Sequence, residues 1–218
     1  RKKYRSEIKL FGNPKEKVMR AAKQQMMLKG NCVGLLGGSF NPPHGGHVHI
    51  TDQAIQAFCL HKVWWLVTPG NPLKSKRPIS IDIRVSECRK LVKKPKVYVS
   101  DLEVTLNTQF TAETLRKLFK CYPGVHFVWL MGADNLVNFH KWDQWTWIME
   151  NIPIGVMARP GEQVKAGLSK AASRYRKFRV KSASAAAIPF MKAPAWSLLG
   201  GPMRSVSSSE IRLRGRQK

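Results

Sequence analysis

The most informative segment of this chain is Gly37-Gly38-Ser39-Phe40-Asn41-Pro42-Pro43-His44-Gly45-Gly46-His47. It follows a short apolar run, Cys32-Val33-Gly34-Leu35-Leu36, and precedes a segment with helical character, residues 47–60. The pattern predicts a strand, then a turn rich in Gly and Pro, then the start of a helix. At such a junction an α/β protein presents backbone N–H groups and the positive end of a helix to a phosphate.

Two other interpretations of this stretch are weaker. A cluster of Gly and Pro between a strand and a helix is often only a tight turn, but the whole string is far more specific than its parts. His44 and His47 could form half of a metal site, yet no nearby Cys, Asp or Glu completes the three protein ligands that zinc usually needs. The stretch also differs from the P-loop and from the GxGxxG fingerprint. We therefore expect no metal held by protein side chains here.

The rest of the chain alternates apolar runs with helix-like segments. We expect strands at residues 32–38, 63–67, 96–100, 125–131, 152–158 and 195–199. We expect helices at residues 47–60, 80–92, 111–119, 142–150 and 207–213, with a further helix in the basic, Ala/Ser-rich region 162–187. This alternation predicts an α/β, Rossmann-like parallel sheet with helices on both faces. Ligands should then lie at the carboxyl ends of the strands.

Length and composition are those of one domain with a real core. The chain has 218 residues and is 43% hydrophobic. We divide it into a basic N-terminal extension, residues 1–29, and a single domain, residues 30–218. The four cysteines stand in apolar surroundings without CxxC spacing, which predicts buried, reduced thiols. No run approaches the ~18 apolar residues of a membrane span, and no signal-peptide pattern is present, so we expect a cytoplasmic protein without a membrane partner.

The chain is strongly basic, with a formal net charge of +25. Such a charge attracts polyanions, and nucleic acid is the obvious candidate. Much of the excess lies at the two ends, in residues 1–30 and 165–218. Because no RRM, KH or helix-turn-helix signature is present, we expect at most non-specific nucleic-acid binding. A dedicated nucleic-acid-binding protein remains the alternative from another functional class.

Several motifs together resemble one enzyme family. The string GSFNPPHGGH resembles the G-[ST]-F-[DN]-P-x-H-x-G-H signature of nucleotidyltransferases with HxGH-type sites. Residues 131–135 (MGADN), 139–142 (FHKW) and 207–212 (SSSEIR) follow in an order and spacing similar to the bacterial nicotinate-nucleotide adenylyltransferases. The resemblance covers roughly residues 30 to 214. It implies ATP-dependent adenylyl transfer to nicotinate mononucleotide, which yields deamido-NAD and pyrophosphate.

The implied reaction needs positioning and charge neutralisation more than it needs a base. The nucleophile is an ionised phosphate oxygen, so no general base is required, and the site should be rich in backbone N–H groups, His, Arg and Lys. Mg²⁺ would be held mainly by the phosphates of ATP, since the motifs supply few carboxylates. The resemblance assigns catalysis to His44, His47 and Arg212. It assigns ATP binding to Gly37, Gly38, Ser39, Phe40, Asp134, Ser207, Ser208 and Ser209.

The resemblance also indicates where the pyridine nucleotide binds. Trp142 would stack on the nicotinate ring, whereas we expect Trp145 and Trp147 to pack in the core. Phe110 stands where the family usually has Tyr, and Asn41 where it often has Asp. The residues expected around nicotinate mononucleotide are Thr68, Lys74, Thr111, Trp142 and Arg159.

The nearest alternative is the same chemistry on another phosphorylated acceptor. Nicotinamide mononucleotide differs from the acid at one group, so the choice depends on the donors around one carboxylate. Phosphopantetheine is a further candidate, but the MGADN and FHKW motifs speak against it.

Overall fold

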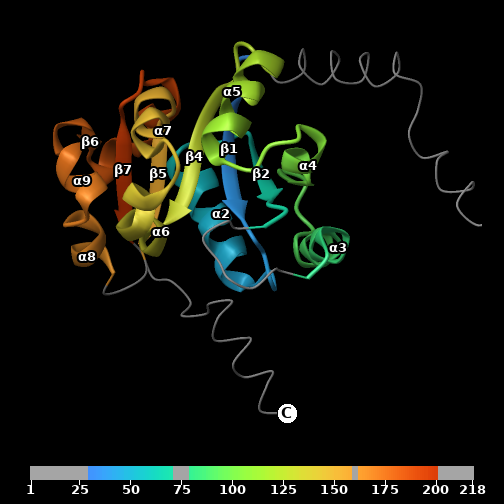
Figure 1. Cartoon of the computed structure of the whole chain (residues 1–218). Coiled ribbons are helices and arrows are strands. Elements are labelled where there is room, and N and C mark those ends of the chain that lie inside the picture. The colour runs from blue at the N-terminus through green and yellow to red at the C-terminus, as the bar shows by residue number, and fades with distance from the viewer. Residues whose placement is uncertain (1–28, 71–78, 159–161, 201–218) are drawn as a thin grey trace, which may run out of the picture.

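The computed structural model describes residues 29–70, 79–158 and 162–200 (Figure 1). Within these ranges the strands form one seven-stranded sheet in which every pair is parallel, in the order β3-β2-β1-β4-β5-β7-β6. The strands are β1 (Cys32–Gly38), β2 (Lys62–Val67), β3 (Val97–Ser100), β4 (His126–Gly132), β5 (Ile154–Ala158), β6 (Arg179–Val180) and β7 (Trp196–Gly200). The predicted Rossmann-like parallel sheet is therefore confirmed.

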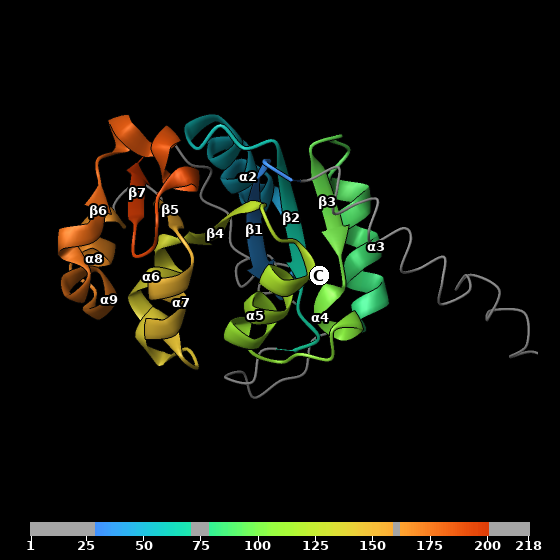
Figure 2. The ribbon, with the colours of Figure 1, turned by 90° about the horizontal axis from the view of Figure 1, so that it is seen from above.

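Helices cover both faces of this sheet. In chain order they are α2 (Gly45–Ala57), α3 (Ile81–Leu91), α4 (Leu102–Thr105), α5 (Thr111–Cys121), α6 (Ala133–Asn138), η2 (Phe139–Lys141), α7 (Trp145–Asn151), α8 (Gln163–Gly167), α9 (Lys170–Arg174), η3 (Arg176–Phe178) and η4 (Ser182–Phe190). Figure 2 shows α2 on one side of the sheet and α5, α6 and α7 on the other. Right-handed crossovers produce this arrangement, because the chain moves from β1 toward β3 and then returns to β4.

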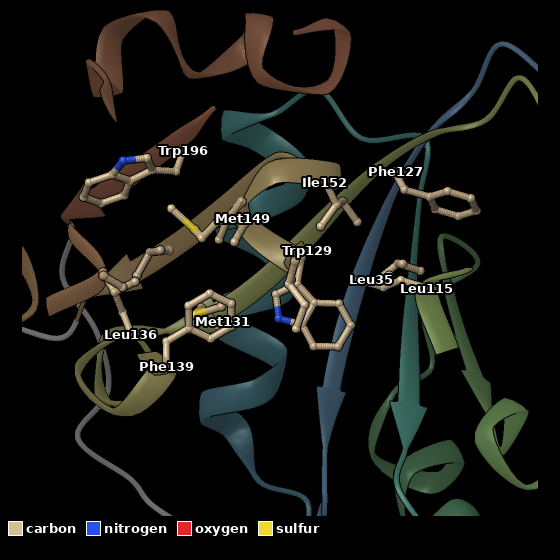
Figure 3. Close-up of a cluster of buried hydrophobic side chains, with 14 of the residues drawn as sticks. Leu35, Leu115, Phe127, Trp129, Met131, Leu136, Phe139, Met149, Ile152 and Trp196 are labelled. Carbon is tan, nitrogen blue, oxygen red and sulfur yellow. The ribbon is translucent and has the colours of Figure 1, made fainter. Parts of the chain in front are cut away.

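The core consists of two apolar clusters, one on each face. In β4, Phe127, Trp129 and Met131 belong to the cluster under α5 to α9, while Val128 and Leu130 belong to the cluster under α2, α3 and η4. This alternation is the period of two that a strand buried on both faces must show. Trp129 lies in the middle of the first cluster, between Leu35 on one side and Phe139 on the other (Figure 3).

The switch point of the sheet lies between β1 and β4. From β1 the chain continues into β2 on one side, while β4 occupies the other side. Open α/β sheets bind ligands outside the carboxyl ends of the strands at such a point. The turn after β1 and the start of α6 after β4 flank this position. No helix of the described ranges combines the length and apolarity needed to cross a membrane.

Most predicted elements are confirmed, and the errors have physical reasons. The six predicted strands agree with the structure within two residues, but β6 was missed because a two-residue strand carries no periodicity. The helix predicted from residue 142 begins at Trp145: Trp142 has extended backbone (φ −76°, ψ 146°), and Gln144 is left-handed (φ 50°). The short α4 was also missed. The helix predicted at residues 207–213 lies outside the described residues.

The prediction of buried thiols is half right. Cys32 and Cys88 are buried in the cluster under α2 and α3, whereas Cys59 and Cys121 are exposed. All four are free thiols. Cys59 lies in the turn after α2, with a φ of 50°, and Cys121 is the last residue of α5. Apolar neighbours in the sequence therefore did not predict burial at the ends of helices.

Candidate functional site

Two histidines form the entrance of α2. His44 is the N-cap residue, with extended backbone, and its Nδ1 accepts the N–H of Gly46 at 3.1 Å. The Nδ1 of His47 accepts the N–H of His44 at 3.2 Å. The two contacts make a capping box, which satisfies backbone donors that the first turn of a helix leaves without partners. The ring centroids lie 4.0 Å apart.

This capping has a chemical consequence for both rings. A neutral imidazole has one nitrogen that accepts and one that donates. Because the backbone uses each Nδ1 as an acceptor, the proton of each neutral ring is on Nε2. His44 and His47 therefore present two N–H donors beside the positive end of a thirteen-residue helix. Such a pair suits an anionic ligand.

Two consecutive hydrogen bonds, through Thr51 and Trp65, stabilise the position of His47. The hydroxyl of Thr51 donates to the His47 carbonyl at 2.8 Å, and the indole N–H of Trp65 donates to the same hydroxyl at 2.8 Å. Thr51 and Trp65 are both buried. Trp65 belongs to β2, so the sheet itself holds the first turn of α2.

Phe40 connects the same turn to the core. Its ring stacks on Trp65 at 4.9 Å and lies 4.6 Å from the ring of His47. Its backbone is left-handed, with a φ of 43°, a conformation that disfavours a non-glycine residue. Burial of the ring, which is 1% exposed, offsets that strain. The side chain of Phe40 thus has a packing role, and only its backbone is left to contact a ligand.

Two glycines of the motif have different reasons to be glycine. A Cβ on Gly37 would lie 2.6 Å from Cη2 of Trp129, so the indole ring requires its absence. A Cβ on Gly45 would meet nothing within 4 Å. Packing therefore explains Gly37 but not Gly45, which is the first residue of α2.

Arg84 is a site residue that our sequence reasoning missed. Arg84 is 1% exposed. Its guanidinium donates to four backbone carbonyls: Nε to Ile79 at 2.7 Å, Nη1 to Ser39 at 2.6 Å and Thr68 at 2.7 Å, and Nη2 to Pro69 at 3.2 Å. Burial lowers its pKa. The available signal was a charged residue four positions before Cys88, on the apolar face of the predicted helix 80–92.

Of the residues predicted around the pyridine ring, Thr68 and Thr111 lie near the carboxyl edge of the sheet. Thr68 follows β2, and its N–H donates to the Gly38 carbonyl at 3.0 Å. Thr111 is the first residue of α5, which must begin at this edge because it leads back to the start of β4. Thr108 and Thr114, whose hydroxyls lie 2.8 Å apart, secure the entry of that helix.

Trp142 is half-buried and packs against two aromatic rings in T-shaped arrangements. Its centroid lies 6.2 Å from Trp129 at 84° and 5.2 Å from Phe139 at 66°. Trp145 and Trp147 pack against the same apolar cluster, as expected. Trp147 also stacks under Arg116, whose guanidinium carbon lies 4.0 Å from the ring centroid.

Asp134 and Glu103 both follow strands at this edge. Asp134 is exposed in the first turn of α6, directly after β4. Glu103, in α4 after β3, was not expected: it is 3% exposed, and its Oε2 has no hydrogen-bond partner among the described residues. Burial raises the pKa of Glu103 to about 7.

The described residues thus bring together the ends of β1, β2 and β4, the start of α2 and the start of α6. Within these ranges no three His, Cys, Asp or Glu side chains are grouped so as to hold a metal ion. The arrangement is one of N–H donors, suited to phosphate groups. Several predicted site residues lie outside the described residues: Lys74, Arg159, Ser207, Ser208, Ser209 and Arg212.

Comparison with known proteins agrees with this geometry. A family model described as cytidylyltransferase-like matches residues 35–214. A protein of Cereibacter sphaeroides called probable nicotinate-nucleotide adenylyltransferase is 54% identical over 184 residues, which cover 84% of this chain and 97% of that protein. A protein of Parvibaculum lavamentivorans with the same description is 45% identical and covers 89% of this chain and 97% of its own length.

One solved structure shares the fold at low sequence identity. It is the Plasmodium falciparum nicotinic acid mononucleotide adenylyltransferase complexed with NaAD. The TM-score is 0.64 at 20% identity, and the match covers 84% of this chain and 83% of that one. At this identity the likeness supports the fold alone.

Proposed function

This chain belongs to the cytidylyltransferase-like family and, within it, to the nicotinate-nucleotide adenylyltransferases, and on that premise we propose how its residues perform the reaction. The enzyme transfers the adenylyl group of ATP to nicotinate mononucleotide, releasing pyrophosphate and forming deamido-NAD. The residue assignment rests on the observation that Nδ1 of His44 and of His47 each accepts a backbone N–H at the start of α2, from which we infer a proton on each Nε2.

The two histidines act on the phosphates of ATP. A phosphate oxygen of nicotinate mononucleotide forms a bond to the α-phosphorus, and the bond from that phosphorus to the bridging oxygen breaks. Negative charge grows on the departing pyrophosphate. The Nε2–H groups of His44 and His47, with the positive end of α2, stabilise that charge. By the resemblance of residues 207–212 to the family motif, Ser207, Ser208, Ser209 and Arg212 add donors to the same phosphates.

Mg²⁺ fits this site as a companion of the nucleotide. A magnesium ion that accompanies ATP is held largely by phosphates and water, with few protein carboxylates. The donors assembled here, mainly histidine N–H and backbone N–H groups, leave the ATP phosphates to coordinate the ion. Bound Mg²⁺ would neutralise part of the phosphate charge. Asp134, exposed after β4, is assigned to the ribose of ATP.

Nicotinate mononucleotide, the acceptor, binds beside the ATP site, against residues of the neighbouring loops. We assign the nicotinate ring to Trp142, which packs against Trp129 and Phe139 and is half-buried, so that part of its indole remains exposed for stacking. Thr68 and Thr111 lie at the same sheet edge, and Lys74 and Arg159 are assigned to the acceptor by sequence position.

A substrate panel tests the activity. Purified protein is incubated with ATP and Mg²⁺ and with either nicotinate or nicotinamide mononucleotide, and pyrophosphate release is followed. We expect release with the acid and much less with the amide. Equal pyrophosphate release with both nucleotides would show that the enzyme does not prefer the acid. No release with either nucleotide would show that pyridine mononucleotides are not its acceptors.

His47→Ala and Arg212→Ala should each lower turnover by orders of magnitude while the protein stays folded.

We also propose that residues 1–29 are an extension outside the catalytic domain. The family match begins at residue 35 and β1 begins at Cys32, which supports a domain boundary near residue 30. A chain that starts at residue 30 should retain pyrophosphate release. Loss of activity in this folded, shortened chain would contradict the boundary. The four free thiols fit the cytoplasmic location that we propose.

A further inference from the structure

We propose that Arg84 is a positioning residue that aligns the ATP turn with the acceptor loop. This inference rests on the proposed function. The ATP turn begins at Ser39, after β1, and the acceptor loop begins at Thr68, after β2. One nitrogen of Arg84, Nη1, donates to the carbonyls of both residues, at 2.6 Å and 2.7 Å. A single atom therefore connects the two substrate loops.

The connection lies where the sheet no longer holds the two segments together. The last paired residues of β1 and β2 are Gly38 and Val67, followed by the hydrogen bond from the Thr68 N–H to the Gly38 carbonyl. Beyond this point the hydrogen bonds of Arg84 connect the segment after β1 to the segment after β2. Its Nε donates to the Ile79 carbonyl, which ties the same guanidinium to the segment that leads into α3.

The chemistry of the guanidinium suits this task. Its donors lie in one rigid plane, so the directions of the accepting carbonyls are constrained as well as their distances. Charge-assisted hydrogen bonds are stronger than neutral ones, and a buried carbonyl that loses its donor is costly. Among the described residues Arg84 forms no ion pair with a carboxylate. Backbone carbonyl dipoles stabilise this buried charge.

Binding these carbonyls also fixes the direction of two backbone N–H groups. A trans peptide unit is planar, and its C=O and N–H point in opposite directions. When Arg84 binds the Ser39 carbonyl, it directs the N–H of Phe40 away from itself. When it binds the Pro69 carbonyl, it does the same for the N–H of Gly70. One side chain thus orients one amide in each substrate loop.

The expected effect is on turnover more than on binding. Each loop has other groups that bind its own nucleotide, but the reacting phosphate and the α-phosphorus must meet in line at about 3–3.5 Å. A displacement of about 1 Å can lower the rate by about 100-fold. Without Arg84 the two loops are no longer held at one separation. The loss should therefore appear in kcat, with smaller changes in the affinity for either nucleotide alone.

The test compares Arg84→Lys and Arg84→Met with two controls on the same helix. Val85→Ala removes buried packing from the adjacent position, and Arg89→Met removes an exposed positive charge. For each variant we would measure Tm, kcat, and the Kd of ATP and of nicotinate mononucleotide separately. We expect both Arg84 variants to lose about 100-fold in kcat. Val85→Ala should lose Tm but keep kcat, and Arg89→Met should keep both. Wild-type kcat in either folded Arg84 variant would overturn the inference.

A measurement on the wild-type protein covers the case in which neither Arg84 variant folds. Amide hydrogen exchange, followed by NMR, should show ATP slowing exchange at Phe40 and nicotinate mononucleotide slowing it at Gly70. If neither amide is protected, the inference is wrong. Failure of the proposed function is distinguishable, because wild-type protein would then release no pyrophosphate with nicotinate mononucleotide.

Discussion

The ring of His47 caps the backbone of His44: Nδ1 of the first accepts the N–H of the second at 3.2 Å. The two ring nitrogens of His47 therefore have different roles: Nδ1 stabilises the start of the helix, and Nε2 is the atom that we propose to contact ATP. The same division holds for His44, whose Nδ1 accepts the Gly46 N–H. Replacing a histidine by alanine removes both nitrogens at once, so a more selective substitution is needed to separate stability from activity.

Asn and Gln can separate the two roles of His47. The amide oxygen of Asn can take the place of Nδ1, whereas the amide nitrogen of Gln approximates Nε2. We expect His47→Asn to keep the wild-type Tm and to lose about 10²- to 10³-fold in kcat, the typical effect of removing a donor to developing charge. His47→Gln should lose less activity and more stability. The measurements are pyrophosphate release and thermal unfolding; full activity in His47→Asn would exclude Nε2 from the mechanism.

Two glycine substitutions should have opposite effects. Gly37→Ala places a Cβ 2.6 Å from the Trp129 ring, and overpacking of this kind costs about 1–3 kcal/mol. Gly45→Ala places a Cβ in open space at the first position of α2, where Ala favours the helix. We expect a lower Tm for Gly37→Ala. For Gly45→Ala we expect an unchanged or higher Tm with a raised KM for ATP. An unchanged KM would mean that ATP does not approach this residue.

Glu103 should make stability depend on pH. An ordinary Glu titrates near 4.5, and burial raises the pKa of Glu103 to about 7. Between these values the folded state keeps a proton that the unfolded chain has lost, so stability falls as the pH rises from about 4.5 to about 7. The full effect is about 3 kcal/mol.

Urea unfolding of wild type and Glu103→Gln at pH 5 and pH 8 measures this contribution. The difference between the two proteins cancels the other titrating groups. We expect Glu103→Gln to gain stability relative to wild type at pH 8 but not at pH 5. A difference that is the same at both pH values would show that Glu103 is ionised in the folded protein.

The cysteines should react in two classes. Cys59 and Cys121 are exposed, while Cys32 and Cys88 are buried. Burial raises the pKa of both buried thiols, that of Cys88 to about 12, so neither supplies much thiolate at neutral pH. With a chromogenic disulfide reagent we expect two thiols to react in the native protein and four in denaturant. Rapid reaction of all four without denaturant would contradict the burial.

The sequence predicted most of the fold because its signals are local. A strand such as Phe127 to Met131 is indicated by an unbroken apolar run. The helix predicted at residues 80–92 begins at Ile81, although the Ser80 side chain before it makes no capping hydrogen bond. The histidine pair was found for the same reason, since His44 and His47 are only three positions apart. Local patterns failed where structure depended on distant neighbours, as at the exposed Cys59 and the extended backbone of Trp142.

The sequence alone predicted the order of most strands and helices, the parallel sheet that follows from that order, and the position of the His44 motif after β1. Which distant atoms meet at that site became clear only from the three-dimensional fold. Arg84 binds Ser39 across 45 positions of the chain, and Gly37 must lack a Cβ because of Trp129 in another strand. The physical reason is that a hydrogen bond or a close packing contact depends on distance in space. Residue type and local periodicity carry no information about which loop a buried guanidinium will reach.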